Sequence, residues 1–399
     1  MKNYYLKALT LLSCLLIGIT AHAHDFEAQN SDGAKIYYDI TSSTDKTVSV
    51  TYQGSSSTEN VEYSGEITIP ETVTYNGTIY SVTSIDSYAF STCSGLTSVE
   101  IPNSIIHIGE EAFINCVGLS SITIPNSITS IGNYAFYNCI ALRELQIEKG
   151  ESTLSLGYNR YNSSGTGKGL FYDCPLETLY IGRNISYSSE KSYGYSPFYN
   201  KTTLKSITIS NSVTSIGDYA FNGCNSFTSI TIPNSITIIG DWTFANCGAL
   251  VSVEISNSVT NIGEDAFLRC TSLTEITCES VMPPTAYSNT FQNVPTTATL
   301  YVPAGSKEAY ASAEGWSHFT NIVEYDTITG VESSFADDSV AISVENGNIV
   351  VNGVADNVNV EVYDVNGQSI YCGTATTIPV AVKGLYIVKV NGKSFKVLL

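Results

Sequence analysis

Basic side chains are scarce in this 399-residue sequence. It contains 18 Lys plus Arg against 37 Asp plus Glu, and only 14% of its residues are charged. Proteins that bind nucleic acids use clustered Lys and Arg to displace counterions from phosphates. The shortage of such side chains therefore argues against a nucleic-acid partner. The length exceeds the usual size of one domain, so more than one module is expected.

Histidine is nearly absent as well. Of the four His residues, the three beyond residue 23 lie far apart, at His24, His107 and His318. That spacing does not match a set of metal ligands, and the GxSxG, HExxH and EF-hand patterns do not occur. The GTGKG at 165–169 differs from a phosphate-binding loop because Asn162 stands where that pattern needs Gly. We expect no cofactor, no metal ion and no catalytic site.

Long apolar runs are missing after residue 23, so no later stretch has the roughly 20 apolar residues of a membrane-spanning helix. Residues 1–23 combine Lys2 and Lys7, the run ALTLLSCLLIGIT and the tripeptide Ala21-His22-Ala23, which predicts a secretory signal peptide cleaved after Ala23. Its removal leaves 16 basic and 37 acidic residues, a net charge of about −21. Lipidation at Cys14 is the alternative, because LLSC loosely resembles a lipoprotein box.

The sequence is rich instead in copies of a 23-residue phrase, seen most clearly as SSITIPNSITSIGNYAFYNCIAL at 120–142. Its Phe recurs every 23 residues from Phe90 to Phe136 and again from Phe198 to Phe267, and a Cys follows three residues after each copy except Phe198. The Phe residues are Phe90, Phe113, Phe136, Phe198, Phe221, Phe244 and Phe267. Repetition at this period predicts a solenoid.

One phrase is too small to fold alone. Its eight apolar residues each gain roughly 1.5–3 kcal/mol at most on burial, whereas ordering 23 residues costs roughly 1–2 kcal/mol each. Stacked coils bury the faces of their neighbours, so stability becomes a sum of repeat and interface terms. The predicted apolar set of one coil is Leu119, Ile122, Ile124, Ile128, Ile131, Ala135, Phe136 and Cys139.

The Leu-x-x-Ile-x-Ile part of the phrase alternates between apolar and polar residues, which predicts a short strand in a parallel sheet. Eight such phrases begin at Leu96, Leu119, Leu142, Leu176, Leu204, Phe227, Leu250 and Leu273. Glycines follow a later Ile at Gly109, Gly132, Gly217, Gly240 and Gly263. They predict either a positive φ or a close neighbour at this position. Asp86 replaces Gly in the first repeat, and Asp also tolerates the left-handed region.

These residues resemble the BspA-like leucine-rich repeats. The family pattern LxxIxIPxSVTxIGxxAFxxC stands almost unaltered at 96–116, 119–139, 227–247 and 250–270, and the resemblance covers roughly residues 79–280. It implies a secreted or surface-exposed bacterial protein that binds other molecules, often an adhesin, without catalysis. The predicted fold class is mainly β, with a leucine-rich-repeat solenoid whose parallel sheet has eight short strands, a β-rich N-terminal cap and a C-terminal β-sandwich.

Ten Cys in an exported protein would ordinarily indicate disulfides. Seven of them, however, occupy one equivalent position in successive coils: Cys93, Cys116, Cys139, Cys174, Cys224, Cys247 and Cys270. Side chains stacked in parallel do not point at one another as a disulfide requires. We therefore predict buried, unpaired thiols, and we place Cys278 at the second Ile position of its strand.

The pattern divides the chain into six segments. They are a signal peptide at 1–23, a β-rich cap at 24–78, repeats at 79–281 with an irregular insertion at 148–203, a C-terminal cap at 282–325, a linker at 326–339 and a β-sandwich at 340–399. In the C-terminal cap, Ser306 is the predicted N-cap of a short helix through Ala313. Trp316, Phe319 and Ile322 have the size to seal the last coil.

Residues 340–399 carry several alternating strands, with hairpin-turn signals at Asn366-Gly367 and Asn391-Gly392. The segment NVEVYDVNGQSIY and the final segment GLYIVKVNGKSFKVLL resemble the C-terminal sorting domain of type IX secretion. That resemblance implies outer-membrane export or surface attachment. Its basic end is matched by Lys383, Lys389, Lys393 and Lys396. A β-sandwich that only packs or binds is the alternative.

The period fails between Ile147 and Ser206, where Phe136 and Phe171 are 35 residues apart and Phe171 and Phe198 are 27 apart. Insertions in solenoids map to loops on one face, often the binding face, and Tyr among Ser, Gly and Asn is typical of recognition loops. The candidate ligand-binding residues here are Tyr158, Tyr161, Tyr193 and Tyr195. An ordinary solvated insertion is the competing interpretation.

The outward strand positions form a second candidate surface. They are mostly Ser and Thr, which also simply suit strands, and the departures from this rule are the candidate residues Glu100, Gln146, Tyr180 and Glu254.

The leading hypothesis is a secreted or surface-displayed binding protein, outside the outer membrane, that recognises a protein or glycan ligand on host or neighbouring cells. A structural cell-surface spacer is the second hypothesis, and a secreted enzyme the third.

Overall fold

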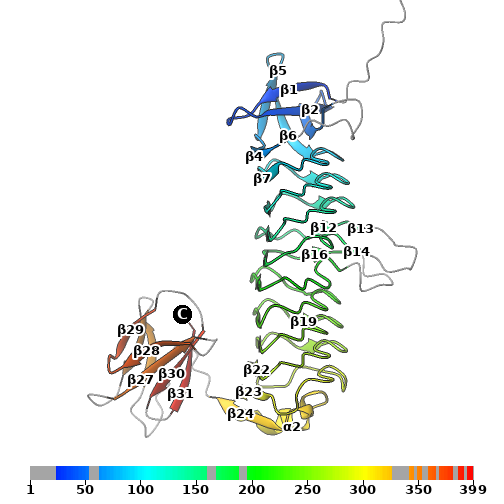
Figure 1. Ribbon diagram of the computed structural model, residues 1–399. Coiled ribbons are helices and arrows are strands. Elements are labelled where there is room, and N and C mark those ends of the chain that lie inside the picture. The colour runs from blue at the N-terminus through cyan, green and yellow to red at the C-terminus, as the bar shows by residue number, and fades with distance from the viewer. Residues whose placement is uncertain are drawn as a thin grey trace, which may run out of the picture.

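The computed structural model describes residues 24–53, 63–159, 168–187, 196–325, 341–345, 348–352, 358–364, 368–380, 385–390 and 393–398. The predicted signal peptide, the predicted linker and both predicted hairpin turns lie outside these residues. The fold is mainly β, as predicted, and its central part is a stack of coils (Figure 1). Among the described residues, no helix has both the length and the apolar character needed to cross a bilayer.

The main ladder of the solenoid is built from the Leu-x-x-Ile-x-Ile phrases, and all eight predicted strands are present. Most neighbours pair in parallel and in register, as Leu145 does with Ile122 and with Leu179. The ladder is divided into three sheets, because the strand at Leu96–Glu100 is not paired with that at Ser121–Ile124, nor the strand at Ser206–Ile209 with that at Ser229–Ile232. The ladder is longer than predicted, because β4 pairs with β7 before it and β23 and β24 continue it. Its strands are β4 (Gly65–Thr68), β7 (Leu96–Glu100), β9 (Ser121–Ile124), β11 (Glu144–Ile147), β15 (Thr178–Ile181), β17 (Ser206–Ile209), β18 (Ser229–Ile232), β20 (Ser252–Ile255), β22 (Glu275–Cys278), β23 (Thr299–Pro303) and β24 (Asn321–Tyr325).

A second ladder runs along the other side of each coil, and the sequence pattern did not predict it. Most of its strands have only two or three residues, and all except Ile185–Ser186 bury an Ile or Leu. Ile131, for example, pairs with Ile108 and Leu156. The strands are β6 (Thr78–Ile85), β8 (His107–Ile108), β10 (Ser130–Ile131), β12 (Leu154–Leu156), β16 (Ile185–Ser186), β19 (Ile238–Ile239) and β21 (Asn261–Ile262).

Between the two ladders lies one continuous core. All eight residues of the apolar set predicted for the coil at 119–139 are buried. The Phe rings of successive coils stack nearly parallel, with centroids 4.9 Å apart at Phe90 and Phe113 and 5.9 Å apart at Phe171 and Phe198. The stacked rings are Phe90, Phe113, Phe136, Phe171, Phe198, Phe221, Phe244, Phe267 and Phe291.

The repeat glycines are required by close packing and not by backbone conformation. A Cβ on Gly132 would lie 2.5 Å from the backbone nitrogen of Glu110 in the preceding coil, so a side chain does not fit there. Positive φ occurs elsewhere in the coil, at residues such as Tyr134 and Asn138. The left-handed interpretation of Asp86 is therefore wrong. Its carboxylate instead accepts a hydrogen bond of 2.6 Å from the hydroxyl of Ser49 in the cap.

The cysteine ladder is present as predicted, and no disulfide joins the Cys residues among the described residues. Each ladder thiol from the second coil onward donates to the carbonyl oxygen of the Phe in the preceding coil. The Sγ to O distance is 3.1 Å from Cys139 to Phe113 and 3.2 Å from Cys247 to Phe221. Burial raises the pKa of Cys116, Cys224, Cys247 and Cys270, to about 12 for Cys270. They are therefore packing groups with a weak donor, and not reactive nucleophiles.

The N-terminal segment covers the first coil with a mixed sheet that continues into the second ladder. Its strands are β1 (Phe26–Gln29), β2 (Lys35–Ser42), β3 (Thr47–Thr51) and β5 (Thr72–Tyr75), with β6 joining it to β8. Tyr63 stands over the Phe stack, with its ring centroid 4.7 Å from that of Phe90. This sheet therefore removes the open strand edge that a bare first coil would present.

The C-terminal end of the array gains one more coil before it closes. Phe291 continues the ring stack, and Trp316, Phe319 and Ile322 are buried over it as expected. The predicted helix is α2 (Lys307–Ser312), and a single 3-10 turn, η2 (Trp316–His318), follows. Ser306 is the N-cap residue of α2. The predicted side-chain cap is wrong, because the Ser306 hydroxyl makes no cap hydrogen bond. The backbone N–H of Lys307 donates instead to the Glu324 carboxylate, at 2.9 Å.

The C-terminal module has its own core, separate from that of the solenoid. Residues such as Ile349, Val362 and Val388 fill it. Two antiparallel sheets, ordered β25-β26-β29 and β28-β27-β30-β31, supply these residues. The strands are β25 (Ala341–Glu345), β26 (Asn348–Asn352), β27 (Val360–Asp364), β28 (Ser369–Gly373), β29 (Thr377–Pro379), β30 (Leu385–Val390) and β31 (Lys393–Leu398).

Candidate ligand-binding surfaces

Both excess segments of the irregular region leave the solenoid from adjacent strands. The first follows β12 and the second follows β16, and these two strands pair in parallel in the second ladder. Gly157 directly follows the first of these strands, and Tyr187 directly follows the second. The described ends of both insertions therefore lie on the same side of the solenoid.

Tyr158 begins the first excursion in a small antiparallel pair, β13 (Tyr158–Asn159) with β14 (Lys168–Gly169), at the right of the solenoid in Figure 1. Its carbonyl accepts the backbone N–H of Tyr134 at 3.2 Å, and its own N–H donates to the Asn133 side chain at 3.1 Å. Tyr158 is thereby fixed beside Tyr134. The other insertion candidates, Tyr161, Tyr193 and Tyr195, lie outside the described residues.

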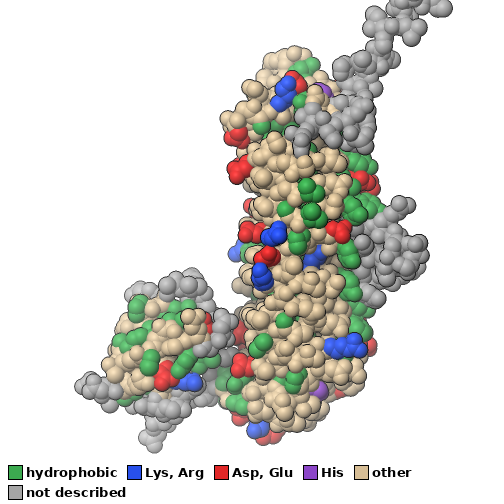
Figure 2. Space-filling view, viewed as in Figure 1, with side chains coloured by type: hydrophobic (Ala, Val, Ile, Leu, Met, Phe, Trp, Pro, Cys, Tyr) green, Lys and Arg blue, Asp and Glu red, His purple; other side chains and the backbone are tan. Residues whose placement is uncertain are grey.

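Tyr158 belongs to a larger set of aromatic side chains, which we call the aromatic flank. Its members are Tyr134, Tyr137, Tyr158, Tyr172, Tyr219 and Trp242. Tyr137, Tyr158 and Tyr172 are 37%, 39% and 37% exposed, and the Tyr134 and Tyr137 rings lie 6.3 Å apart. Figure 2 shows hydrophobic side chains along this edge of the solenoid, where β13 and β14 leave it.

Most of the aromatic flank was missed by sequence reasoning. Tyr134, Tyr219 and Trp242 all stand two residues before a stacked Phe, and Tyr137 and Tyr172 stand one residue after one. These shared positions in the 23-residue phrase could have revealed the aromatic flank, because equivalent positions of a solenoid align along its axis.

The outward positions of the main ladder lie on the other side of the coil. Gln146 and the half-buried Tyr180 are direct neighbours in register. Glu100 accepts the Thr68 hydroxyl at 3.3 Å, and Glu254 accepts that of Thr231 at 3.2 Å. The structure thus brings Gln146 and Tyr180 together, but it separates them from Glu100 and Glu254 along the axis and from Tyr158 across it.

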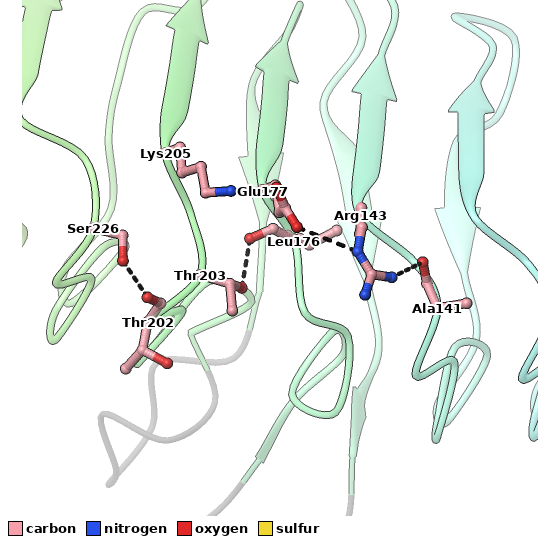
Figure 3. A network of polar contacts seen from close by, with 8 residues as sticks. All are labelled: Ala141, Arg143, Leu176, Glu177, Thr202, Thr203, Lys205 and Ser226. Carbon is pink, nitrogen blue, oxygen red and sulfur yellow. Dashed lines mark hydrogen bonds and ion pairs between the residues drawn. The ribbon is translucent and has the colours of Figure 1, made fainter.

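An ion-pair network lies on the main-ladder side of the solenoid, where the 23-residue period is interrupted (Figure 3). The Glu177 carboxylate lies 3.2 Å from Arg143 Nε and 2.6 Å from Lys205 Nζ, so one acid bridges three successive coils. Hydrogen bonding and charge from Lys205, with a smaller contribution from Arg143, lower the pKa of Glu177. All three side chains are substantially exposed, so the network orders the surface more than it stabilises the fold.

Two further cations are buried inside the break. Lys201 occupies the place of the ladder Cys in the coil of Phe198, and its ammonium donates to the carbonyl oxygens of Phe171, Tyr172 and Cys174. Burial lowers the pKa of Lys201 to about 8, whereas the three carbonyl acceptors favour the charged form. The ammonium therefore replaces the thiol donor of the regular coils and ties two coils together.

Arg183 lies on the other side of the coil and reaches back to an earlier one. It donates to the carbonyl oxygens of Asn126 at 2.9 Å and Pro125 at 2.8 Å, and to the Ser152 hydroxyl at 3.2 Å. A cavity of about 30 Å³ lies next to it, lined by residues that include Tyr187, Phe198 and Phe221. The irregular coils are thus held by polar groups where packing is incomplete.

Comparison with known families identifies the repeats. The model of the BspA type leucine-rich repeat region matches residues 78–197 and 191–313. Comparison with curated proteins returns no match.

Similar solved structures include leucine-rich repeat proteins from three bacteria. One from Bacteroides ovatus is 22% identical over 76% of this chain and 77% of that chain, with a TM-score of 0.42. A leucine rich cell surface protein from Faecalibacterium prausnitzii is 18% identical over 76% and 96%, with a TM-score of 0.27. A leucine rich repeat protein from T. pallidum is 20% identical over 62% and 87%, with a TM-score of 0.32. The family assignment rests on the repeat match, which covers more than half of the sequence: this chain belongs to the BspA type leucine-rich repeat family.

Proposed function

We propose that this protein is exported and binds other molecules noncovalently at the cell surface, as an adhesin-like receptor for host protein, matrix or glycan. The observation that carries the proposal is the cluster of exposed Tyr side chains where the repeat is interrupted. Tyr supplies a large contact area and a hydroxyl group while losing little conformational entropy.

The fold supports binding because it makes the surface rigid. The stacked Phe rings and the two ladders fix each coil against its neighbours, so an outward side chain is held in place before a ligand arrives. Such preorganisation lowers the entropy cost of association. The binding role proposed here is not enzymatic.

Export is proposed from the N-terminal segment, whose Lys residues, apolar run and AxA sequence are those of a signal peptide. Surface attachment through the C-terminal module is proposed from its separate core and from its sequence resemblance to sorting domains. Fractionation of producing cells tests both. Recovery of the full chain in the cytoplasm would contradict the proposal.

A structural spacer is the second candidate function. It is favoured by the main-ladder face, where Thr123, Thr208 and Thr231 repeat the same small, exposed polar side chain at equivalent positions. A spacer needs such a uniform, solvated surface and no ligand.

Glycan and protein arrays separate the two candidates. We expect reproducible binding by the intact protein, and a loss of binding when Tyr158, Tyr161, Tyr193 and Tyr195 are replaced together by Ser. A circular dichroism spectrum identical to that of the parent protein is the folding control. Absence of binding to every array would leave the spacer as the better explanation.

A further inference from the structure

The second ladder is interrupted between the coil of Phe198 and the coil of Phe221, and we call this junction the joint. β16 pairs with β12 on one side, and among the described residues no strand pairs with β16 on its other side. Ile216, in the coil of Phe221, forms a bridge with Ile239 of the coil after it. The second ladder therefore stops at the joint and starts again beyond it.

The sequence of the Phe198 coil explains the interruption. Tyr187 follows a strand that is in register with β12, so it takes the place of Leu156 and Ile131 in the two earlier coils. It stands six residues after Ile181, whereas Ile131 stands seven after Ile124. The coil is therefore one residue short before the second ladder, and a large polar aromatic replaces the aliphatic residue there.

Side chains replace the missing ladder bonds across the joint. Asn184 donates to the hydroxyl of Thr214 at 2.9 Å and accepts its backbone N–H at 2.8 Å. The Tyr187 hydroxyl donates to the carbonyl oxygen of Asp218 at 2.9 Å. All three bonds lie at the exposed surface, where water competes for the same groups. The cavity of about 30 Å³ lies behind them, between the two coils.

The turns that carry the Phe residues are also weakly joined here. Between the coils of Phe221 and Phe244, three turn residues donate backbone N–H groups one coil onward: Tyr219, Phe221 and Gly223. Across the joint, among the described residues, the backbone of Asn200 alone does so, to Asn222. The centroid distances of the ring stack are largest on the two sides of Phe198, at 5.9 Å and 5.8 Å.

The buried cations of the Phe198 coil hold it to earlier coils and do not cross the joint. Lys201 donates to carbonyl oxygens of the Phe171 coil, and Arg183 donates to those of Pro125 and Asn126. The main ladder does cross the joint, because β15 and β17 pair in register over their whole length. It is interrupted only at the next junction, between β17 and β18, where the turn bonds hold the coils together. The joint is thus fixed along the main ladder and weakly held elsewhere.

We infer that the solenoid bends at the joint, with the paired strands β15 and β17 as the hinge and the second-ladder side opening and closing. Hinge motions of this kind occur on the microsecond to millisecond timescale. The bend needs no ligand and therefore goes beyond the proposed binding function. It changes the distance between the parts of the aromatic flank on either side, at Tyr172 and Tyr219. A rigid ligand that contacts both parts selects one bend angle.

Frozen-solution EPR of nitroxide pairs tests this inference on the chain that follows the predicted signal peptide, with Cys372→Ser removing the exposed thiol. The ladder Cys residues are buried and do not react with the label. Pairs of introduced Cys residues each span three coil steps, about 14 Å. Positions 130 and 215 span the joint on the second-ladder side, 123 and 208 span it within the main ladder, and 107 and 186 end before it.

We expect the distance distribution of the pair at 130 and 215 to be at least about twice as wide as that of the other two pairs. Asn184→Ala removes both bonds to Thr214 and should widen this distribution further. Ser127→Ala is the matched control, because it removes a bond of 2.7 Å to the Ile105 carbonyl between two earlier coils, and it should leave the width unchanged. Equal unfolding temperatures of the labelled proteins control for folding.

Equal widths for all three pairs would overturn the inference. A distribution for 107 and 186 as wide as that for 130 and 215 would overturn it too, because the flexibility would then not be confined to the joint. No widening in Asn184→Ala would show that the exposed bridge does not restrain a bend. Ligand binding by a protein that fails these tests would leave the proposed function standing.

Discussion

The coil around Phe244 and the coil around Phe198 carry chemically different side chains, a thiol and an ammonium, at the same position of the turn. Cys247 in the regular coil and Lys201 in the irregular one occupy the same place, three residues after the stacked Phe. Both are buried, and both donate to the carbonyl oxygen of the Phe one coil earlier. In both coils this place therefore supplies a buried hydrogen-bond donor, although one side chain is neutral and the other is charged.

The surroundings of the two coils differ more than their turns do. Cys247 lies among regular coils whose apolar positions are filled, whereas Phe198 borders a cavity and Arg183 crosses to an earlier coil nearby. Buried cations are costly unless several acceptors surround them. The break supplies those acceptors, and it does so where the chain departs from its 23-residue period.

The largest expected effect comes from moving the cation into the regular coil. Cys247→Lys places a long, charged side chain where the structure provides space and an acceptor for a thiol. We expect a loss of at least about 4 kcal/mol of unfolding free energy, from overpacking and an underpaired buried charge. Denaturant unfolding followed by fluorescence measures it. Cys247→Ala is the control and should lose only about 1–2 kcal/mol. Similar values for the two variants would contradict this account.

The Phe stack offers a direct comparison of packing in the two coils. Phe244→Ala should cost about 3–5 kcal/mol, because the ring is fully buried between two neighbours. Phe198→Ala should cost less, since Phe198 already borders a cavity and has fewer contacts to lose. Thermal and denaturant unfolding of both variants under the same conditions measures the difference. A larger cost at Phe198 would show that the break is not underpacked.

Much of the regular part of the solenoid was predictable from the sequence, because the same residue types recur at equivalent positions of each repeat. The eight main-ladder strands, the buried thiols and the closing role of Trp316 follow from equivalent positions in the phrase. The second ladder was missed because a strand such as Ser130–Ile131 is too short to show an alternating pattern.

The details of the break were less predictable, since they depend on contacts between coils. The sequence marked Phe198 as the one repeat without a Cys, but not the three carbonyl groups around Lys201. It identified Tyr158 as a candidate, but not its pairing with Gly169 beside Tyr134. The function of the repeat glycines was left open between two causes, and only the close approach of Gly132 to Glu110 decides it.

The charge on Lys201 predicts a pH-dependent difference between variants. Lys201→Met removes a buried ammonium, and two of its three acceptors keep backbone donors, Cys174 N–H at Phe171 and Leu176 N–H at Cys174. We expect a stabilisation of about 1–3 kcal/mol at pH 7. The folded pKa of about 8 lies below the ordinary value of 10.5. The cost of burying the charge is therefore fully present below pH 8 and fades as the pH rises toward 10.5.

Chemical denaturation of the parent protein and of Lys201→Met at pH 7 and pH 10 measures how the difference between their unfolding free energies narrows. Comparing variant with parent cancels the titration of the buried thiols, which changes with pH in both proteins. Lys205→Met, at an exposed cation four residues away, should show no such pH dependence. A gap that stays constant or widens between pH 8 and pH 10 would contradict the buried-charge explanation.

The smallest effect is expected at the exposed ion pairs of the same coils. Glu177→Gln removes the carboxylate between Arg143 and Lys205, and we expect only a slight fall in unfolding temperature, because exposed pairs are solvated and screened by salt. The pKa of Glu177 is lowered in the folded state. The contribution is therefore present at neutral pH and is lost as the pH falls through that lowered pKa. Scanning calorimetry at low and high ionic strength measures it, with Glu144→Gln on the same face as the control. A large, salt-independent loss would mean that this surface network contributes far more to the stability of the irregular coils than an exposed ion pair should.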